Sequence, residues 1–455
     1  MKATASTLAE IWSTPAAGTS QERVQVAVTR AFNLYWALDL PAQAKAVLRH
    51  AETALTDPGA RAEVAAVLAG LLLNGGSISQ ALQALEPVLA RLDADPRSTV
   101  QALVVAIPAL FHAGRCEQAI TAARRAFACE QRLGEEVVPW GHLQITVNLG
   151  NAYLAAGRVN DTDTLATENY DQAIEHTGPF PVEKALWACS LGQIARARGQ
   201  VRTALRWQRE AATAATAKIP LPFMPQILGE LAHSAALAGD LAAAHAALAE
   251  AEQYTAAGTR LFHLWAALAR PWEAAARGER STAIRLAMEL AEQAQSRGQV
   301  TFQLQALHDV ARLGGASRVT SSLHRAAAGA EGQLAPLYVS HAAALEAQDG
   351  LALDQIASGF AALGFNLLAG EAAAEAARAL QAEGRRTAAE AAATRATTLT
   401  AQCEGARTPA LDLLQRRDLT PRELEIATMA ARGLSSKTIA ERLVVSVRTV
   451  DNTLH

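Results

Sequence analysis

Residues 235–251 read AALAGDLAAAHAALAEA, and this stretch decides the fold. Small and apolar residues precede Gly239, Asp240 follows it, and alanine and leucine then continue at helical spacing. Glycine readily takes the left-handed conformation that ends a helix. A single pair of helices cannot bury both of its apolar faces, so pairs must stack on one another. The stretch therefore predicts a helical hairpin that is one unit of an array.

The same pattern recurs between residues 21 and 400. The glycines predicted to end the first helix of each hairpin are Gly76, Gly114, Gly157, Gly199, Gly239, Gly278, Gly315, Gly350 and Gly384. Their spacings lie between 43 and 34 residues, and a period of about 34 residues is typical of tetratricopeptide repeats. A further first unit is predicted at residues 35–38, with its turn at Asp39 to Pro41. The array is thus expected to hold about ten hairpins.

The composition supports an all-α protein. Hydrophobic residues make up 50% of the chain but aromatic residues only 5%, which favours helices packed through alanine and leucine over a large aromatic core. In an α-solenoid each unit contacts only its neighbours, so stability should be close to additive over the units. Deletion of one unit, such as residues 239–277, is therefore expected to leave a folded protein.

A second pattern occupies residues 419–455, which read LTPRELEIATMAARGLSSKTIAERLVVSVRTVDNTLH. Thr420 can cap a helix whose first residue is Pro421, and Glu423 completes a capping box. Gly433 is placed to end this helix in the left-handed conformation. These signals predict a short helix that differs in kind from those of the array.

Two further helices follow in the same segment. Ser435 can cap the first, which should end near residue 443, and Ser446 can cap the second. The side chains predicted to face inward in the three helices are Leu424, Ile426, Met429, Ala430, Ile439, Ala440, Leu443, Val447, Val450 and Leu454. Two helices joined by a three-residue turn, with the small Ala440 where they cross, form a helix-turn-helix, whose last helix enters the DNA major groove.

These residues resemble the LuxR-type DNA-binding domain. The positions that match the family pattern are Leu419, Thr420, Arg422, Glu423, Gly433, Ser435, Lys437, Ile439, Ala440, Leu443, Ser446, Thr449 and Val450. The segment departs from the family at Ser436 and Thr438, which stand for asparagine and glutamate, and at Thr453, which stands for histidine. The resemblance implies a fourth, dimerising helix after His455, so the chain is expected to be truncated and to bind DNA weakly.

The resemblance also implies roles for individual residues of the third helix. Asp451, Asn452 and His455 are expected to face base edges, and asparagine can pair with adenine through two hydrogen bonds. The residues expected to contact the DNA backbone are Lys437, Arg448 and Thr449. Residues 419–455 contain five basic and four acidic side chains, so electrostatic attraction to phosphate should be weak.

The array more loosely resembles the tetratricopeptide-like sensor region of large LuxR-type regulators related to the maltose activator. Those regulators carry an ATPase module of the STAND class, whereas this chain has no G-x-x-x-x-G-K-[ST] motif, and no cofactor is predicted. The cysteines are dispersed, without the spacing of a zinc site, and are expected to be small buried residues; they are Cys116, Cys129, Cys189 and Cys403. The histidines and serines show no catalytic motif. The chain is therefore predicted not to be an enzyme.

Four tryptophans fall within adjacent repeats: Trp187, Trp207, Trp265 and Trp272. The concave surface of a solenoid is its usual binding face, so these residues could bind an effector there. The alternative is that they form ordinary core between repeats.

Three segments are predicted: a sensor or interaction array over residues 1–400, a tether over residues 401–418 with one helical turn at residues 411–414, and the DNA-binding segment 419–455. No apolar run is long enough to span a membrane, so a cytoplasmic protein without membrane contact is expected. The predicted function is a bacterial transcriptional regulator that binds double-stranded DNA and senses a small molecule or protein. A homodimer is the expected assembly on DNA. The alternatives are a protein-binding scaffold with a vestigial DNA reader, or the C-terminal fragment of an ATP-switched STAND-class regulator.

Overall fold

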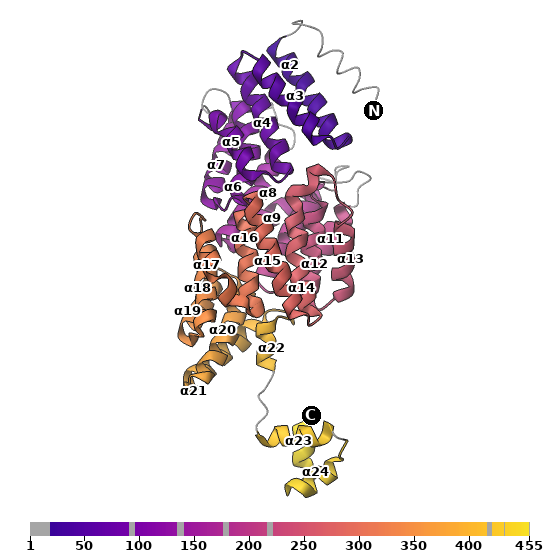
Figure 1. The fold of residues 1–455 in the computed structure, drawn as a ribbon, viewed down its shortest axis with the longest axis vertical. Helices are drawn as coiled ribbons and strands as arrows, with labels where there is room; N and C mark the ends of the chain where they lie inside the picture. Colours follow the sequence, from indigo (N-terminus) through magenta and orange to yellow (C-terminus); the bar gives the residue numbers. More distant parts are fainter. Residues whose placement is uncertain are drawn as a thin grey trace.

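The computed structural model describes residues 19–90, 96–133, 141–175, 182–215, 222–415, 421–431 and 433–454. Within these ranges all regular secondary structure is helical, which confirms the all-α prediction (Figure 1). None of the described helices is long and apolar enough to cross a membrane.

Ten helical hairpins make up the array within the described residues. The hairpins are α2 (Ser20–Phe32) with α3 (Pro41–Ala54), α4 (Pro58–Asn74) with α5 (Ile78–Leu89), α6 (Pro96–His112) with α7 (Cys116–Leu133), α8 (Gly141–Ala156) with α9 (Val159–Glu175), α10 (Val182–Ala197) with α11 (Val201–Ala215), α12 (Met224–Ala238) with α13 (Leu241–Ala251), α14 (His263–Ala276) with α15 (Arg280–Arg297), α16 (Val300–Val310) with α17 (Ala316–Ala327), α18 (Leu334–Ala347) with α19 (Gly350–Ala362), and α20 (Asn366–Ala382) with α21 (Arg386–Ala401). Three short helical segments interrupt this order: η1 (Asn33–Ala37), η2 (Ala257–Phe262) and η3 (Ala311–Gly315).

The hairpin turns lie where the sequence predicts them, with two exceptions. Asp39 and the predicted glycines through Gly278, together with Gly384, have positive φ angles. In the eighth hairpin the left-handed residue is Gly314 (φ +92°) instead of Gly315. In the ninth it is Gln348 (φ +54°).

Gly350 has a different role from the one predicted. It is the first residue of α19, and a Cβ atom built on it would lie 2.6 Å from the Leu380 side chain. This glycine therefore allows α19 and α20 to pack closely instead of ending a helix.

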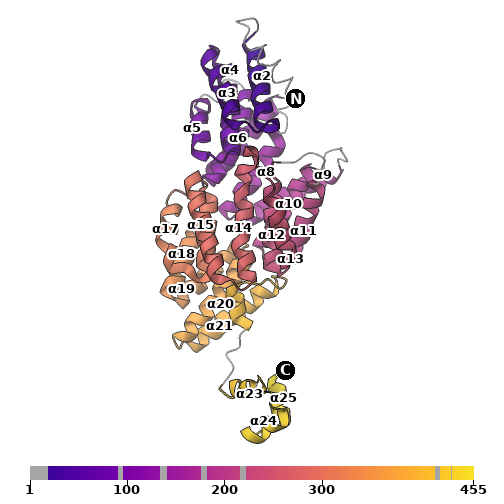
Figure 2. The ribbon, with the colours of Figure 1, turned by 45° about the vertical axis from the view of Figure 1, so that its right-hand side comes forward.

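The array is not a stack in which each unit contacts only its neighbours. Its helices wind into a superhelix (Figure 2), and contacts of α6 with α16, α8 with α18 and α10 with α20 join one turn to the next. The Glu331 amide donates to the Gly114 carbonyl at 2.8 Å and the Gln333 amide to the Ala156 carbonyl at 2.9 Å. The side chain of Asp39 accepts from the Ala257 amide, 218 residues later in the chain. The nearest-neighbour expectation is therefore wrong for this array.

All four cysteines are free and buried, which confirms their interpretation as small core residues. Cys403 lies in the segment predicted as a tether, and it is fully buried beside Gly199. The Glu404 carboxylate accepts from the Thr203 amide and hydroxyl, each at 2.8 Å.

The predicted helical turn of the tether is α22 (Pro409–Gln415). It packs on α20 and η3, and Leu411 is only 5% exposed. Through Leu411 the segment is therefore part of the array instead of a free tether, because its apolar side chains are covered by α20.

Three short helices form the C-terminal unit: α23 (Pro421–Ala431), α24 (Ser436–Leu443) and α25 (Val447–Leu454). The residues of its core are Ile426, Ile439, Ala440, Leu443 and Val450. These were all predicted to face inward. Thr420 and the Leu424 side chain lie outside the described residues.

Two inward predictions in α25 are wrong. Val447 is 43% exposed and Leu454 is 42% exposed, whereas Val450 between them is fully buried. The three side chains share one stripe of the helix, but only Val450 at its centre is buried.

Candidate functional sites

Serine hydroxyls cap the starts of the last two helices of the C-terminal unit. The Ser435 hydroxyl accepts from the Thr438 amide at the start of α24, and the Ser446 hydroxyl accepts from the Thr449 amide at 3.0 Å at the start of α25. Val444 takes the left-handed conformation and ends α24. The three-residue turn between the two helices is thus the predicted one, and it produces a helix-turn-helix.

The outward face of α25 carries three of the predicted DNA-binding residues. At about 100° per residue, Arg448 and Asn452 lie on the side opposite the buried Val450, and Thr449 lies at the flank between them and Val450. All three are exposed. Asp451 is half-buried at the flank of this face. The Thr449 hydroxyl also lies 2.8 Å from that of Ser446, so it takes part in the cap.

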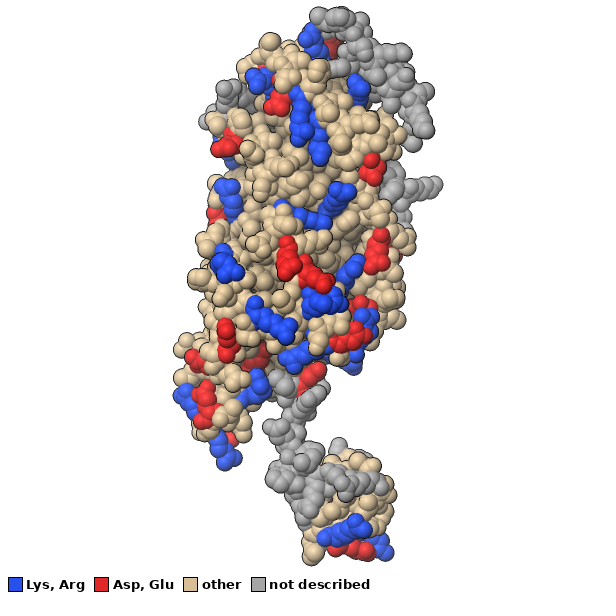
Figure 3. Space-filling view, in the orientation of Figure 1, with Lys and Arg blue, Asp and Glu red and all other residues tan. Residues whose placement is uncertain are grey.

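Lys437 is exposed in the first turn of α24, where backbone amides point outward and phosphate is favoured. His455 lies outside the described residues. On the face shown in Figure 3, basic and acidic side chains are mixed over the array, and both kinds lie together on the C-terminal unit. Any attraction to DNA must therefore come from a few positioned side chains.

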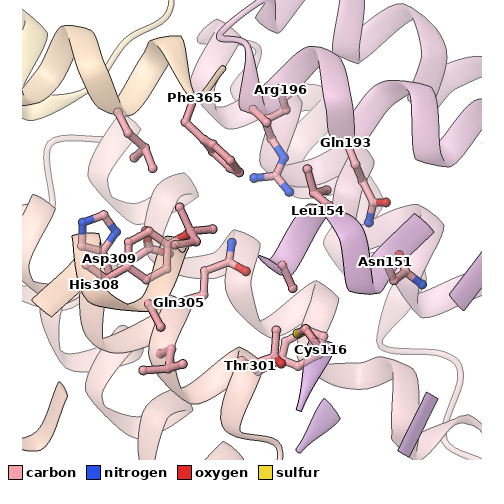
Figure 4. Close-up of a pocket in the computed structure, with 18 of the residues that line it drawn as sticks. Cys116, Asn151, Leu154, Gln193, Arg196, Thr301, Gln305, His308, Asp309 and Phe365 are labelled. Carbon is pink, nitrogen blue, oxygen red and sulfur yellow. The ribbon is translucent and has the colours of Figure 1, made fainter. Parts of the chain in front are cut away.

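A second candidate site is a cavity of about 140 Å³ inside the superhelix. Most of its lining residues come from the first helices of the hairpins, and the others come from η3, the start of α7 and the connecting residues Gly114, Ala330, Glu331 and Phe365. Figure 4 shows that side chains of earlier repeats, such as Arg196, and of later repeats, such as His308, surround this space. Residues labelled there are Cys116, Asn151, Leu154, Gln193, Arg196, Thr301, Gln305, His308, Asp309 and Phe365.

Two partly buried arginines of the cavity wall are held by carboxylates. Arg196 forms hydrogen bonds with both oxygens of Glu230, the shortest at 2.8 Å. Arg312 donates to Glu371 through two nitrogens, at 2.7 and 2.9 Å, and to Asp309 at 2.7 Å. Burial disfavours the charged form of Arg312, but the two carboxylates outweigh this and raise its pKa.

The Arg312 guanidinium also lies 4.2 Å from the centre of the Trp272 ring, as in a cation–π contact. On Trp272 stacks His233, whose pKa is held well below its usual value by burial and by the nearby Arg196 and Arg312. This imidazole is therefore neutral at pH 7.

A chain of hydrogen bonds leads from a buried carboxylate to the cavity. Nε2 of His341 lies 2.8 Å from the Glu375 carboxylate, and Nδ1 of His341 lies 2.9 Å from Nε2 of His308. Burial, His341 and Arg312 hold the pKa of His308 well below its usual value. His308 stacks on Tyr338 with ring centres 4.0 Å apart, so the chain is fixed in orientation.

The structure does not gather the four tryptophans into one surface. Trp187 and Trp272 are each 2% exposed within the core, and Trp207 packs edge-on against Tyr170 at 5.0 Å. Trp265 belongs to an aromatic cluster with Phe302 at 4.5 Å, and it alone of the four lines the cavity.

Sequence reasoning did not identify the charged residues of the cavity. A signal was nevertheless present, because Glu230, Asp309, Glu371 and Glu375 each interrupt an apolar helix face in the printed sequence. A carboxylate at such a position is rarely buried without a partner. Its partners lie in other repeats, however, and the sequence does not name them.

The C-terminal unit matches a known protein family. Residues 417–454 match the bacterial regulatory proteins of the luxR family. The predicted resemblance is confirmed, and the C-terminal unit is a LuxR-type helix-turn-helix.

Two solved structures are similar to the chain at low sequence identity. A Rap protein complexed with competence and sporulation factor is 12% identical with a TM-score of 0.44, over 67% of this chain and 98% of that chain. An IFIT1 monomeric mutant with m7Gppp-AAAA is 13% identical with a TM-score of 0.39, over 94% of this chain and 98% of that chain. No curated protein matches the sequence.

Proposed function

We propose that this chain is a transcriptional regulator in which the array binds an effector and the C-terminal unit reads the DNA major groove. The observation that carries the proposal is the face of α25 formed by Arg448, Thr449 and Asn452, which is exposed on a helix-turn-helix of the luxR family. A capped recognition helix with exposed polar side chains is what major-groove reading requires. The protein is accordingly proposed to be a regulator and not an enzyme.

The proposed division of labour on DNA follows side-chain chemistry. Lys437, Arg448 and Thr449 position the unit on phosphates, which carry no sequence information. Asn452 reads a base edge, and Asp451 can accept from cytosine at the flank. His455 is proposed to extend this base-reading face, and a homodimer on an inverted repeat is the proposed assembly.

The array is proposed to sense its effector through the cavity. The segment that leads to the C-terminal unit packs on the same elements as the cavity wall, because α22 contacts η3 and α20. Those elements carry Arg312 and Glu371, which form the buried ion pair. A ligand that displaces this pair can therefore bias the docking of α22, which is the coupling that regulation needs. Residues 19–411 are proposed to act as one sensor and residues 421–454 as the reader.

The DNA half of the proposal is tested by selecting duplexes from a random pool with the full chain, followed by fluorescence anisotropy. Asn452→Ala should cost roughly 1–3 kcal/mol on the selected sequence and relax one base position. Lys437→Ala should weaken binding to all duplexes alike and reduce the salt slope by about one.

A matched control is Lys45→Ala on α3, which removes the same charge from the array and should leave DNA affinity unchanged. Failure to enrich any duplex sequence would remove the reader from the proposal, and the scaffold alternative would then be favoured. An enriched inverted repeat would indicate two copies per site.

A further inference from the structure

We propose that the cavity of the array binds a ligand carrying an ammonium or guanidinium group, with the carboxylate of Asp309 as its counter-charge. The inference rests on the proposed sensing role of the array and names the chemistry of its effector.

The first observation is a charge imbalance in the interior. Of four buried carboxylates, Glu230 and Asp309 line the cavity, while Glu371 and Glu375 lie behind its wall, bonded to Arg312 and His341. Two guanidiniums, those of Arg196 and Arg312, face these carboxylates. Arg196 pairs with Glu230 through Nε and one terminal nitrogen, while Arg312 is shared between Asp309 and Glu371. The carboxylates outnumber the guanidiniums by two. Buried charge without compensation is costly, so the site favours a cation.

The second observation is an unused oxygen on Asp309. This residue is 1% exposed, and its Oδ1 accepts from Arg312, but Oδ2 has no partner at hydrogen-bond geometry. Burial raises the pKa of Asp309, and the nearby indole N–H of Trp272 acts against this as a donor, although neither Oδ2 nor the indole nitrogen has a partner at hydrogen-bond geometry. A buried carboxylate oxygen that lines a cavity and lacks a donor is the complement of an N–H group.

The rest of the wall suits the body of an organic cation. Phe302, Tyr338 and Phe365 line the same cavity, and their rings offer apolar contact and cation–π attraction. Glu331, which also lines the cavity, adds a further carboxylate. An anionic ligand would instead meet this excess of carboxylates, and it would have to compete with them for Arg196 and Arg312.

The ammonium or guanidinium group can belong to a small amine or to a basic residue of a peptide, and either source would pair with Asp309 in the same way. The test therefore has two arms, each measured as the thermal midpoint of the full chain without DNA. One arm uses benzylamine and 1,4-diaminobutane, with benzyl alcohol and benzoate as neutral and anionic counterparts. The other uses a short alanine peptide with one lysine, against the same peptide with glutamine.

The expected result is a rise in the midpoint with the cationic member of at least one arm and none with its counterparts. Asp309→Asn keeps an oxygen for Arg312 but removes the charge, and it should weaken that binding by roughly tenfold or more. Asp161→Asn is the matched control, since Asp161 forms an exposed ion pair with Arg158, and it should leave binding unchanged.

Three results would overturn the inference: no shift with any cation, equal shifts with the neutral or anionic counterparts, or full cation binding by Asp309→Asn. Far-UV circular dichroism of the variant shows whether it folds, and Asp309→Glu, which keeps the charge, should retain cation binding if the charge is what matters. Because DNA is absent from the assay, these outcomes are independent of the DNA half of the proposed function. Binding of a neutral or anionic ligand in the cavity would overturn the ligand class while leaving the sensing role intact.

Discussion

At the scale of single residues, Val444 carries a backbone conformation that its side chain opposes. It has φ +53° and ψ +49° in the turn of the helix-turn-helix, and it is 91% exposed. A left-handed conformation costs an L-residue roughly 1–2 kcal/mol, and a β-branched side chain is especially unsuited to it. Since this side chain packs on almost nothing, the strain has no compensation from burial.

Val444→Asn is therefore expected to stabilise the C-terminal unit by about 1 kcal/mol, because asparagine tolerates this conformation. Amide hydrogen exchange of α24 and α25 in the full chain measures the change. The neighbouring Val445 packs against the core of the unit, so Val445→Asn should destabilise it and serves as the control. Faster exchange in Val444→Asn would contradict the strain argument.

At the scale of elements, α22 joins the array to the segment before the C-terminal unit. Its Ala410 and Leu411 are each 5% exposed against the array, and the Arg407 amide donates to the Leu237 carbonyl at 2.8 Å. The helix has only seven residues, too few to be stable alone. Its order therefore depends on docking.

Leu411→Asn should detach α22 from the array, since truncating a buried leucine typically costs about 2–5 kcal/mol. Amide hydrogen exchange at residues 409–412 should become roughly tenfold faster or more. The helical circular dichroism of the array should be retained. Asp412→Asn changes an exposed side chain of the same helix and should leave exchange as it is. Unchanged protection in Leu411→Asn would mean that α22 does not depend on this contact.

At the scale of the whole molecule, contacts between superhelical turns make the array cooperative. The Gln118 amide pairs with Glu331, 213 residues away, and the Thr203 amide pairs with Glu404, 201 residues away. Removing one internal hairpin moves every later hairpin relative to the first turn of the superhelix. The pairs Gln118–Glu331 and Thr203–Glu404 then no longer meet. The array thus departs from the additive behaviour of open solenoids.

Deletion of residues 239–277 is now expected to abolish the native fold, with loss of most of the helical circular dichroism and of a sharp thermal transition. Deletion of the terminal hairpin, residues 19–54, should lower the midpoint but keep most helix, because it breaks contacts at one end only. A well-folded internal deletion with native helicity per residue would show that the contacts between turns contribute little.

Much of the fold could be predicted because its signals are local. The Gly239 turn, the Ser435 and Ser446 caps and the inward Val450 each depend on residues within one or two helical turns. Gly350 was misassigned because close packing on Leu380 and a helix end both favour glycine, and only the neighbouring helix distinguishes them. Val447 was wrongly predicted to be buried, because helical periodicity gives the direction of a side chain but not whether another element covers that side chain.

The identity of the reader and the all-α array of hairpins thus follow from the sequence alone, since capping, left-handed glycines and helical periodicity act over short distances along the chain. The cavity, its charged wall and the docking of α22 depend on the tertiary structure. Each hairpin adds a small rotation, and the sum over several hairpins brings together Arg196, Asp309 and Glu371 from distant repeats. No local pattern specifies that sum, so a buried carboxylate can be seen in the sequence while its partner cannot.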